Sequence, residues 1–129
     1  MEFRTCRRHW GAEFISDDVV RFRVWAEGQK DLTLRLTDTD IPMAAVGDGW
    51  FQVDVPGVRH GTPYQFVLQD GMAVPDPASR AQQADVNGPS VVIDPRHNLP
   101  AQREWQGRPW EETVIYEMHI GTFTGEGTF

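Results

Sequence analysis

Short runs of alternating apolar and polar residues, separated by turn residues, fill the chain from Val19 to Val74. Successive side chains of a β-strand point to opposite faces, so each run predicts a strand with one apolar and one polar face. A series of such strands without helical periodicity is typical of an antiparallel sandwich. The residues predicted to face its core are Val20, Phe22, Val24, Leu32, Leu34, Leu36, Phe51, Val53, Val55, Tyr64, Phe66 and Leu68.

Turn sequences and a change in composition divide the chain. Gly47-Asp-Gly49 and Asp70-Gly71 mark turns inside the alternating region. From Pro75 to Trp110 the sequence holds six of its nine prolines and no sustained period, but it keeps the apolar anchors Val91-Val-Ile93, Leu99, Trp105 and Trp110. That combination indicates a linker with a packed course. We therefore expect a sandwich domain at 1–74 and a Pro-rich packed linker at 75–112.

The stretch from Val114 to Ile120 is an almost unbroken apolar, β-prone run. This pattern predicts a strand buried on both faces, as in parallel sheets covered by helices. No second strand of this kind follows, and a complete barrel of eight βα units takes roughly 250 residues. We therefore expect 113–129 to be the start of a truncated barrel. A strand without its neighbours invites pairing with another chain, so we also expect self-association through residues 114–120.

Four sets of motifs stand in order along the chain. They are Trp10-Gly-Ala-Glu13 with Arg21-Phe-Arg-Val-Trp-Ala26, Asp76-Pro-Ala-Ser-Arg80, Asn87-Gly-Pro-Ser90, and Tyr116 to Phe129. Together they resemble the maltooligosyltrehalose trehalohydrolase family of the α-amylase superfamily. The sequence departs from the family pattern at Met118, Gly125 and Asn87, where Leu, Pro and His are usual. None of these changes removes a group to which we would assign a catalytic role.

The resemblance implies an all-β fold, an immunoglobulin-like (early-set) antiparallel β-sandwich, followed by an extended linker and the first strand of a (β/α)8 barrel. It implies a cytoplasmic glycosidase that needs no cofactor and hydrolyses the α-1,4 bond next to the terminal trehalose unit of maltooligosyltrehalose. In such barrels the catalytic carboxylates come from several strand ends. By the resemblance they lie beyond Phe129, so we expect no catalytic residue here and an inactive 129-residue chain.

Two alternative functions remain open at this point. One is the N-terminal module of a glycogen branching or debranching enzyme, because those relatives share looser forms of the same motifs. The other is a non-catalytic glucan-binding module. For the parent enzyme, the expected partners are an α-glucan or maltooligosyltrehalose as substrate and the chain's own missing catalytic barrel.

Two tryptophans are candidates for carbohydrate binding. Alternation places Trp25 and Trp50 on the polar faces of their strands, where a flat indole can stack against a sugar ring. The alternative is that the linker or the barrel covers them, since a large exposed apolar patch usually has a partner.

The barrel strand and the proline turn carry further polar candidates. Glu117 and His119 share one face of the barrel strand, where they either support the substrate pocket from behind or serve as hydrogen-bonded wall residues. Asp76 is expected to accept hydrogen bonds from nearby backbone or from Arg80, which would make its turn structural.

Composition excludes several other classes of function. Twelve basic and nineteen acidic residues give a net charge of −7, which opposes nucleic-acid binding. Cys6 is the only cysteine, so no intrachain disulfide can form, and cytosol is the default location. The scattered histidines lack the clusters of a zinc site. No phosphate-loop motif and no apolar stretch of membrane-spanning length are present, so we expect no cofactor, no metal and no membrane partner.

Overall fold

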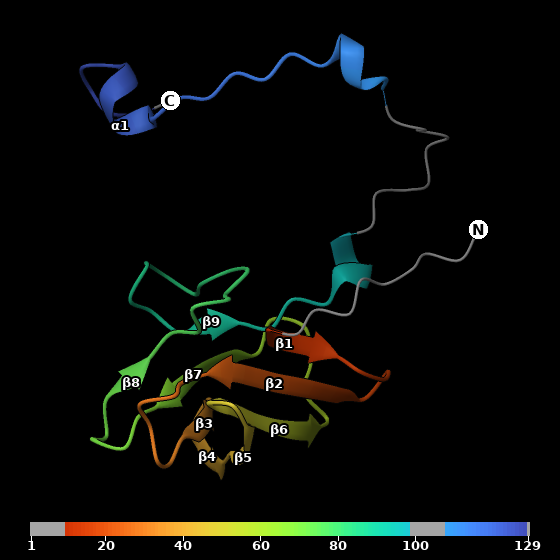
Figure 1. Ribbon diagram of the computed structural model, residues 1–129, viewed down its shortest axis with the longest axis vertical. Coiled ribbons are helices and arrows are strands. Elements are labelled where there is room, and N and C mark those ends of the chain that lie inside the picture. The colour runs from red at the N-terminus through yellow and green to blue at the C-terminus, as the bar shows by residue number, and fades with distance from the viewer. Residues whose placement is uncertain (1–9, 99–107, 129) are drawn as a thin grey trace. The chain divides into compact units, whose positions relative to one another are not determined.

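The computed structural model describes residues 10–98 and 108–128 (Figure 1). The chain divides into two compact units, one up to Leu99 and one from Pro100. The first contains all of the strands that the structure describes.

Two antiparallel sheets form the first unit. One sheet has the strand order β1-β2-β6-β5 and the other β4-β3-β7-β8, with β9 also pairing with β7. The strands are β1 (Gly11–Phe14), β2 (Val19–Trp25), β3 (Thr33–Leu36), β4 (Thr39–Pro42), β5 (Ala44–Gly47), β6 (Trp50–Pro56), β7 (Pro63–Val67), β8 (Ala73–Val74) and β9 (Ser90–Val91). This is the predicted β-sandwich.

The core lies between the two sheets and is made by the apolar faces of their central strands. In the first sheet Phe22 stands opposite Val53, and Val24 stands opposite Phe51. The ring of Phe22 meets that of Tyr64 edge to face, with centroids 5.0 Å apart. The buried apolar residues are Ala12, Val20, Phe22, Val24, Leu32, Leu34, Met43, Phe51, Val58, Tyr64, Phe66 and Val92.

Strand faces follow the predicted alternation. The remaining expected core residues, Leu36, Val53, Val55 and Leu68, are partly buried and pack against this cluster. Three buried residues were not predicted, namely Ala12, Met43 and Val58. They lie in β1 or in connecting segments, where no alternation can be read.

Both predicted turns connect neighbouring strands. Gly47-Asp-Gly49 joins β5 to β6, and Asp48 takes a positive φ of 50° between its two glycines. Asp70-Gly71 joins β7 to β8, where Asp70 Oδ1 accepts a 2.9 Å hydrogen bond from the backbone N–H of Met72. These turns require left-handed backbone, which glycine adopts at little cost.

Residues 75–98 pack within the first unit, which differs from the domain boundary expected at 74. Ser90 and Val91 pair with β7 as strand β9, and Val92 beside them is fully buried. The short 3-10 helix η1 (Pro95–Asn98) follows. Residues 90–92 are therefore packed against the sandwich, while the linker expected over 75–112 stays a prediction. Two of the expected apolar anchors, Leu99 and Trp105, lie outside the described residues, and Trp110 is exposed.

The second unit contains the 3-10 helix η2 (Trp110–Glu112), an extended stretch without strand pairing, and the single-turn helix α1 (Ile120–Phe123). Val114 is 92% exposed and Tyr116 is 69% exposed. A strand needs a hydrogen-bonded neighbour, and none pairs with 113–119 in the part of the chain that the structure describes. The barrel strand therefore stays a prediction. No helix in residues 10–98 or 108–128 has the length and apolar character needed to span a membrane.

Candidate functional site

The outer side of the first sheet carries a cluster that we call the aromatic face: Trp10, Arg23, Trp25 and Trp50. Trp25 and Trp50 stand directly opposite each other on β2 and β6, so their side chains lie on the same side of the sheet. Trp10 immediately precedes β1, and its ring meets that of Trp50 at 5.3 Å and 87°. Three indoles from three segments are thus gathered at one end of the sheet.

Trp50 is already engaged within this cluster. The guanidinium carbon of Arg23 lies 4.6 Å from the centroid of the Trp50 ring, which is a cation–π contact. The ring of Trp10 also contacts that of Trp50. Arg23 Nε is buried and has no hydrogen-bond partner among the described residues, so the indole is the contact that holds this group. Trp50 is half-buried, whereas Trp25 is 51% exposed.

Trp25 and Trp10 supply the accessible aromatic surface. Trp25 is 51% exposed, and its Nε1–H donates a 2.9 Å hydrogen bond to the carbonyl of Asp48, which fixes the ring. Trp10 is 60% exposed. Both tryptophans named from the sequence lie on the polar side as predicted, while Trp10 and Arg23 were not foreseen. Their role in carbohydrate binding stays a prediction.

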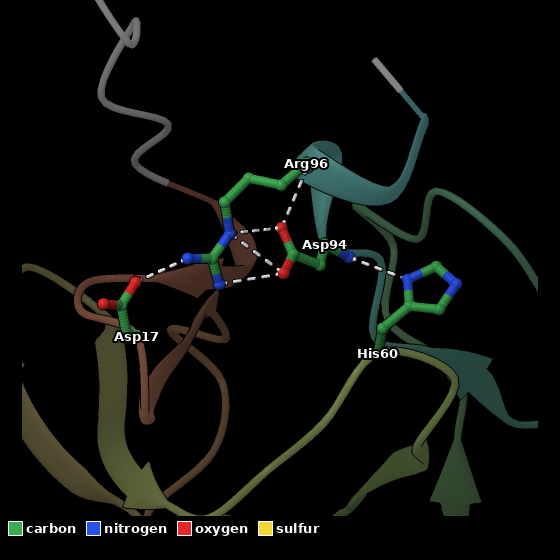
Figure 2. Close-up of polar contacts among 4 residues, drawn as sticks. All are labelled: Asp17, His60, Asp94 and Arg96. Carbon is green, nitrogen blue, oxygen red and sulfur yellow. Dashed lines mark hydrogen bonds and ion pairs between the residues drawn. The ribbon is translucent and has the colours of Figure 1, made fainter. Parts of the chain in front are cut away.

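A second candidate site lies at the opposite end of the same sheet, beside the turn between β1 and β2 (Figure 2). We call it the arginine pocket. Its volume is about 410 Å³. It is lined by Phe14, Asp17, Val58, Arg59, His60, Asp94, Arg96 and His97.

Arg96 is the centre of this pocket. Its guanidinium holds both carboxylate oxygens of Asp94, at 2.8–3.0 Å, and also pairs with Asp17 (Figure 2). The side chain of Asp94 is almost wholly buried, whereas that of Asp17 is 96% exposed. The hydrogen bonds from Arg96 hold the pKa of the Asp94 carboxyl below its usual value, and the two carboxylates raise the pKa of Arg96.

Two histidines form the other wall. His60 Nδ1 accepts a 3.1 Å hydrogen bond from the backbone N–H of Asp94, so the proton of the neutral ring is on Nε2 (Figure 2). The ring of His97 stacks on that of His60 with centroids 4.5 Å apart and planes 25° from parallel. Sequence reasoning missed this site, although one pattern could have indicated it: Asp94-Pro-Arg96 repeats the pairing of an Asp before proline with a nearby Arg seen at Asp76 to Arg80.

Residues from three of the sequence motifs meet at Asp76, whose carboxylate is buried. It accepts hydrogen bonds from Tyr64 Oη and from the backbone N–H of Ala78, each 2.7 Å long. The backbone N–H of Asp76 donates to Ser90 Oγ at 2.9 Å. A Cβ on Gly11, whose φ is +78°, would lie only 3.4 Å from Asp76 Oδ2. Burial raises the pKa of Asp76 above its usual value.

This convergence confirms that the turn is structural. Arg80, at its end, donates a 2.6 Å hydrogen bond to the carbonyl of Ala12 in β1. The network therefore ties residues 76–90 to β1 and β7. These contacts hold residues 76–90 against the sandwich.

Glu117 and His119 lie in the second unit, and both are exposed there. The carbonyl of His119 accepts a 3.1 Å hydrogen bond from the hydroxyl of Thr122 at the start of α1. Glu117 and His119 do not contact each other in the described part of the chain, so their support of a substrate pocket stays a prediction. Across those residues, no three His, Cys, Asp or Glu side chains gather in a way that could hold a metal ion.

No family model matches the chain. Curated relatives do match the chain, among them several malto-oligosyltrehalose trehalohydrolases. That of Saccharolobus solfataricus is 39% identical over 89% of this chain, and that of Deinococcus radiodurans is 36% identical over 84%. The chain spans about one fifth of the length of these relatives (20% and 18%). A 1,4-alpha-glucan branching enzyme of Nitrobacter winogradskyi is 34% identical over 64% of the chain and 12% of its own length.

The chain also matches solved structures. A crystal structure from Salmonella typhimurium, described as a candidate alpha amylase, superposes with a TM-score of 0.80 and 61% identity over 92% of this chain and 20% of its own. A pullulanase of Bacillus acidopullulyticus shares the fold, with a TM-score of 0.64 and 22% identity over 71% of this chain and 12% of its own. The resemblance drawn from the four sets of motifs is confirmed by these matches.

Proposed function

We propose that this chain, similar to part of the maltooligosyltrehalose trehalohydrolases, is the N-terminal region of a cytoplasmic α-amylase-family glycosidase that releases trehalose from maltooligosyltrehalose. The observation that carries the proposal is the run of curated relatives with this one name, matched over 84–89% of the chain. The reaction is the hydrolysis of the α-1,4 bond next to the terminal trehalose unit. Because the chain spans about one fifth of those relatives, the reaction is proposed for the protein that contains it.

In this proposal the sandwich supports the catalytic domain. Glycosidases of this kind place two carboxyl groups on either side of the bond that breaks, and in barrels such groups come from the ends of several strands. Three of the described carboxylates instead have arginine partners: Asp54 pairs with Arg21, Asp40 with Arg35 and Asp94 with Arg96. These pairs stabilise the two sheets and the pocket wall, while the aromatic face and the arginine pocket remain available for contacts.

The test is an assay of the whole protein that contains this sequence. Maltotriosyltrehalose is the substrate, and maltopentaose is the control because it has the same number of glucose units without the trehalose end. We expect free trehalose and maltotriose from the first and much slower cleavage of the second. Formation of α-1,6 branches, or cleavage of pullulan without release of trehalose, would instead support the branching or debranching alternative.

A second candidate function is glucan binding by the aromatic face. The exposed indoles of Trp25 and Trp10 favour it, because a sugar ring can stack on a fixed flat apolar surface. Isothermal titration of the 129-residue chain with maltoheptaose tests this, using Trp25→Ala. Met72→Ala is the matched control, since Met72 is 59% exposed beside the other sheet. Heat that is lost only with Trp25→Ala supports binding, and the absence of heat from the parent chain supports an interdomain contact instead.

A further inference from the structure

The arginine pocket is separate from the aromatic face. Phe14, which lines the pocket, pairs with Val20 at the beginning of β2, whereas Trp25 ends the same strand. The pocket volume of about 410 Å³ falls within the roughly 300–1,000 Å³ usual for small-molecule sites. The seven residues of β2 therefore have a different candidate site at each end.

Rigid ion pairs form the floor of the pocket. Four contacts of 2.8–3.0 Å join the Arg96 guanidinium and backbone N–H to the Asp94 carboxylate, which is almost wholly buried (Figure 2). Arg96 also lies over the ring of Phe14, with its guanidinium carbon 5.5 Å from the centroid. Because these contacts already hold the Arg96 side chain, it loses little conformational freedom when a ligand binds.

The rim offers both hydrogen-bond donors and acceptors. Asp17 uses Oδ1 for Arg96, and its highly exposed carboxylate leaves Oδ2 as an acceptor. His60 uses Nδ1 for the backbone of Asp94, which leaves Nε2–H as a donor in the neutral ring. The guanidinium of Arg59 supplies further donors, which guanidinium groups cannot lose near neutral pH.

Charges in the pocket favour a neutral ligand. Arg59 and Arg96 balance Asp17 and Asp94, so the lining carries no net charge while the histidines are neutral. An anion would meet the exposed carboxylate of Asp17, and a cation would meet Arg59. A polyhydroxyl ligand avoids both repulsions because each hydroxyl can donate to a carboxylate and accept from an N–H group.

We propose that the arginine pocket binds one glucosyl unit of an α-glucan through its hydroxyl groups. The exposed stacked rings of His60 and His97 offer a flat side wall, and Asp17 and His60 act as the acceptor and donor for neighbouring hydroxyls. The choice of glucose as the sugar rests on the proposed function. The preference for a neutral polyhydroxyl ring rests on the pocket alone.

The experiment is an NMR titration of the 129-residue chain with maltotriose, following the imidazole Hε1 signals of His60 and His97. We expect saturable shifts of these two signals. Asp17→Asn should weaken binding by about tenfold, because it removes a hydrogen bond to a charged acceptor. Asp40→Asn is the matched control, since Asp40 also pairs with an arginine but lies on the other sheet. Circular dichroism confirms that both variants keep the fold.

Other outcomes overturn the proposal in distinguishable ways. If Trp25→Ala abolishes binding and Asp17→Asn does not change it, glucan binds to the aromatic face and not to the pocket. If inorganic phosphate shifts the two histidine signals and maltotriose does not, the pocket is an anion site. If maltotriose shifts neither signal, the pocket inference fails, while trehalose release by the whole protein still decides the proposed function independently.

Discussion

Tyr64 Oη donates a 2.7 Å hydrogen bond to Oδ2 of Asp76, and both residues are buried. Tyr64 belongs to β7, at the centre of the second sheet, whereas Asp76 begins the packed segment that follows β8. The contact joins a core strand to the connection between β8 and β9. The hydroxyl of Tyr64 also gives the buried carboxylate of Asp76 a hydrogen-bond donor in place of water.

Tyr64→Phe should destabilise the chain by about 1–3 kcal/mol, because the ring still fills its place while a buried carboxylate loses a hydrogen bond. Urea denaturation of the 129-residue chain measures the change. Tyr116→Phe is the control, since Tyr116 is mostly exposed in the second unit. Equal midpoints for Tyr64→Phe and the parent chain would show that Asp76 does not depend on this hydroxyl.

The faces of the main strands could be predicted because the two-residue period of a strand is visible locally. Val20, Phe22 and Val24 alternate with two arginines and a tryptophan, and only one register buries the apolar set. The turns could be predicted for a similar reason, since their glycines stand at the positions that need positive φ.

The candidate sites could be predicted only in part, because they depend on contacts between distant residues. Arg96 pairs with Asp17 across 79 positions, and His60 meets Asp94 across 34. No local pattern encodes such pairs. Alternation correctly placed Trp50 on the polar face, but its contacts with Trp10 and Arg23 follow from how three strands pair.

The pH dependence of stability should reflect the lowered pKa of Asp94. The group binds its proton less tightly in the folded chain than in the unfolded chain, where the pKa is about 3.9. Its contribution to stability is therefore complete above that value and is lost as pH falls through the folded pKa. Asp94→Asn should be less stable than the parent at pH 7, and the difference should shrink in acid. Thermal melts of both proteins from pH 7 into acid measure this difference in stability. A difference that does not change with pH would contradict the lowered pKa of Asp94.

Gly49→Ala should cost more stability than Gly57→Ala. Both glycines have φ near +76°, at +77° and +75°, so both pay the left-handed penalty of about 1–2 kcal/mol. Only at Gly49 would the new Cβ collide, lying 2.8 Å from Trp25 Nε1 and 2.9 Å from Glu27 Cβ. Tryptophan fluorescence should also change in Gly49→Ala alone. Equal losses of stability in the two variants would show that Trp25 does not pack against this turn.

The 129-residue chain should not release trehalose by itself. It spans about one fifth of the curated trehalohydrolases that it matches, and the family resemblance implies that the catalytic carboxylates lie outside it. Incubation with maltotriosyltrehalose, followed by chromatography, tests this against a mock purification. Trehalose that appears only with the purified chain would require a catalytic pair among its own carboxylates.

Self-association should depend on the apolar stretch 114–120. Val114, Ile115 and Tyr116 are 69–92% exposed in the second unit, and unpaired backbone beside exposed apolar side chains favours pairing between chains. Light scattering after gel filtration should show oligomers of the parent chain and a shift to monomer with Ile115→Lys. Thr113→Lys adds the same charge two residues earlier at an exposed polar position, so it should leave the oligomers largely intact. A parent chain that is monomeric at all concentrations, or equal dissociation by the two variants, would show that this stretch does not form the contact.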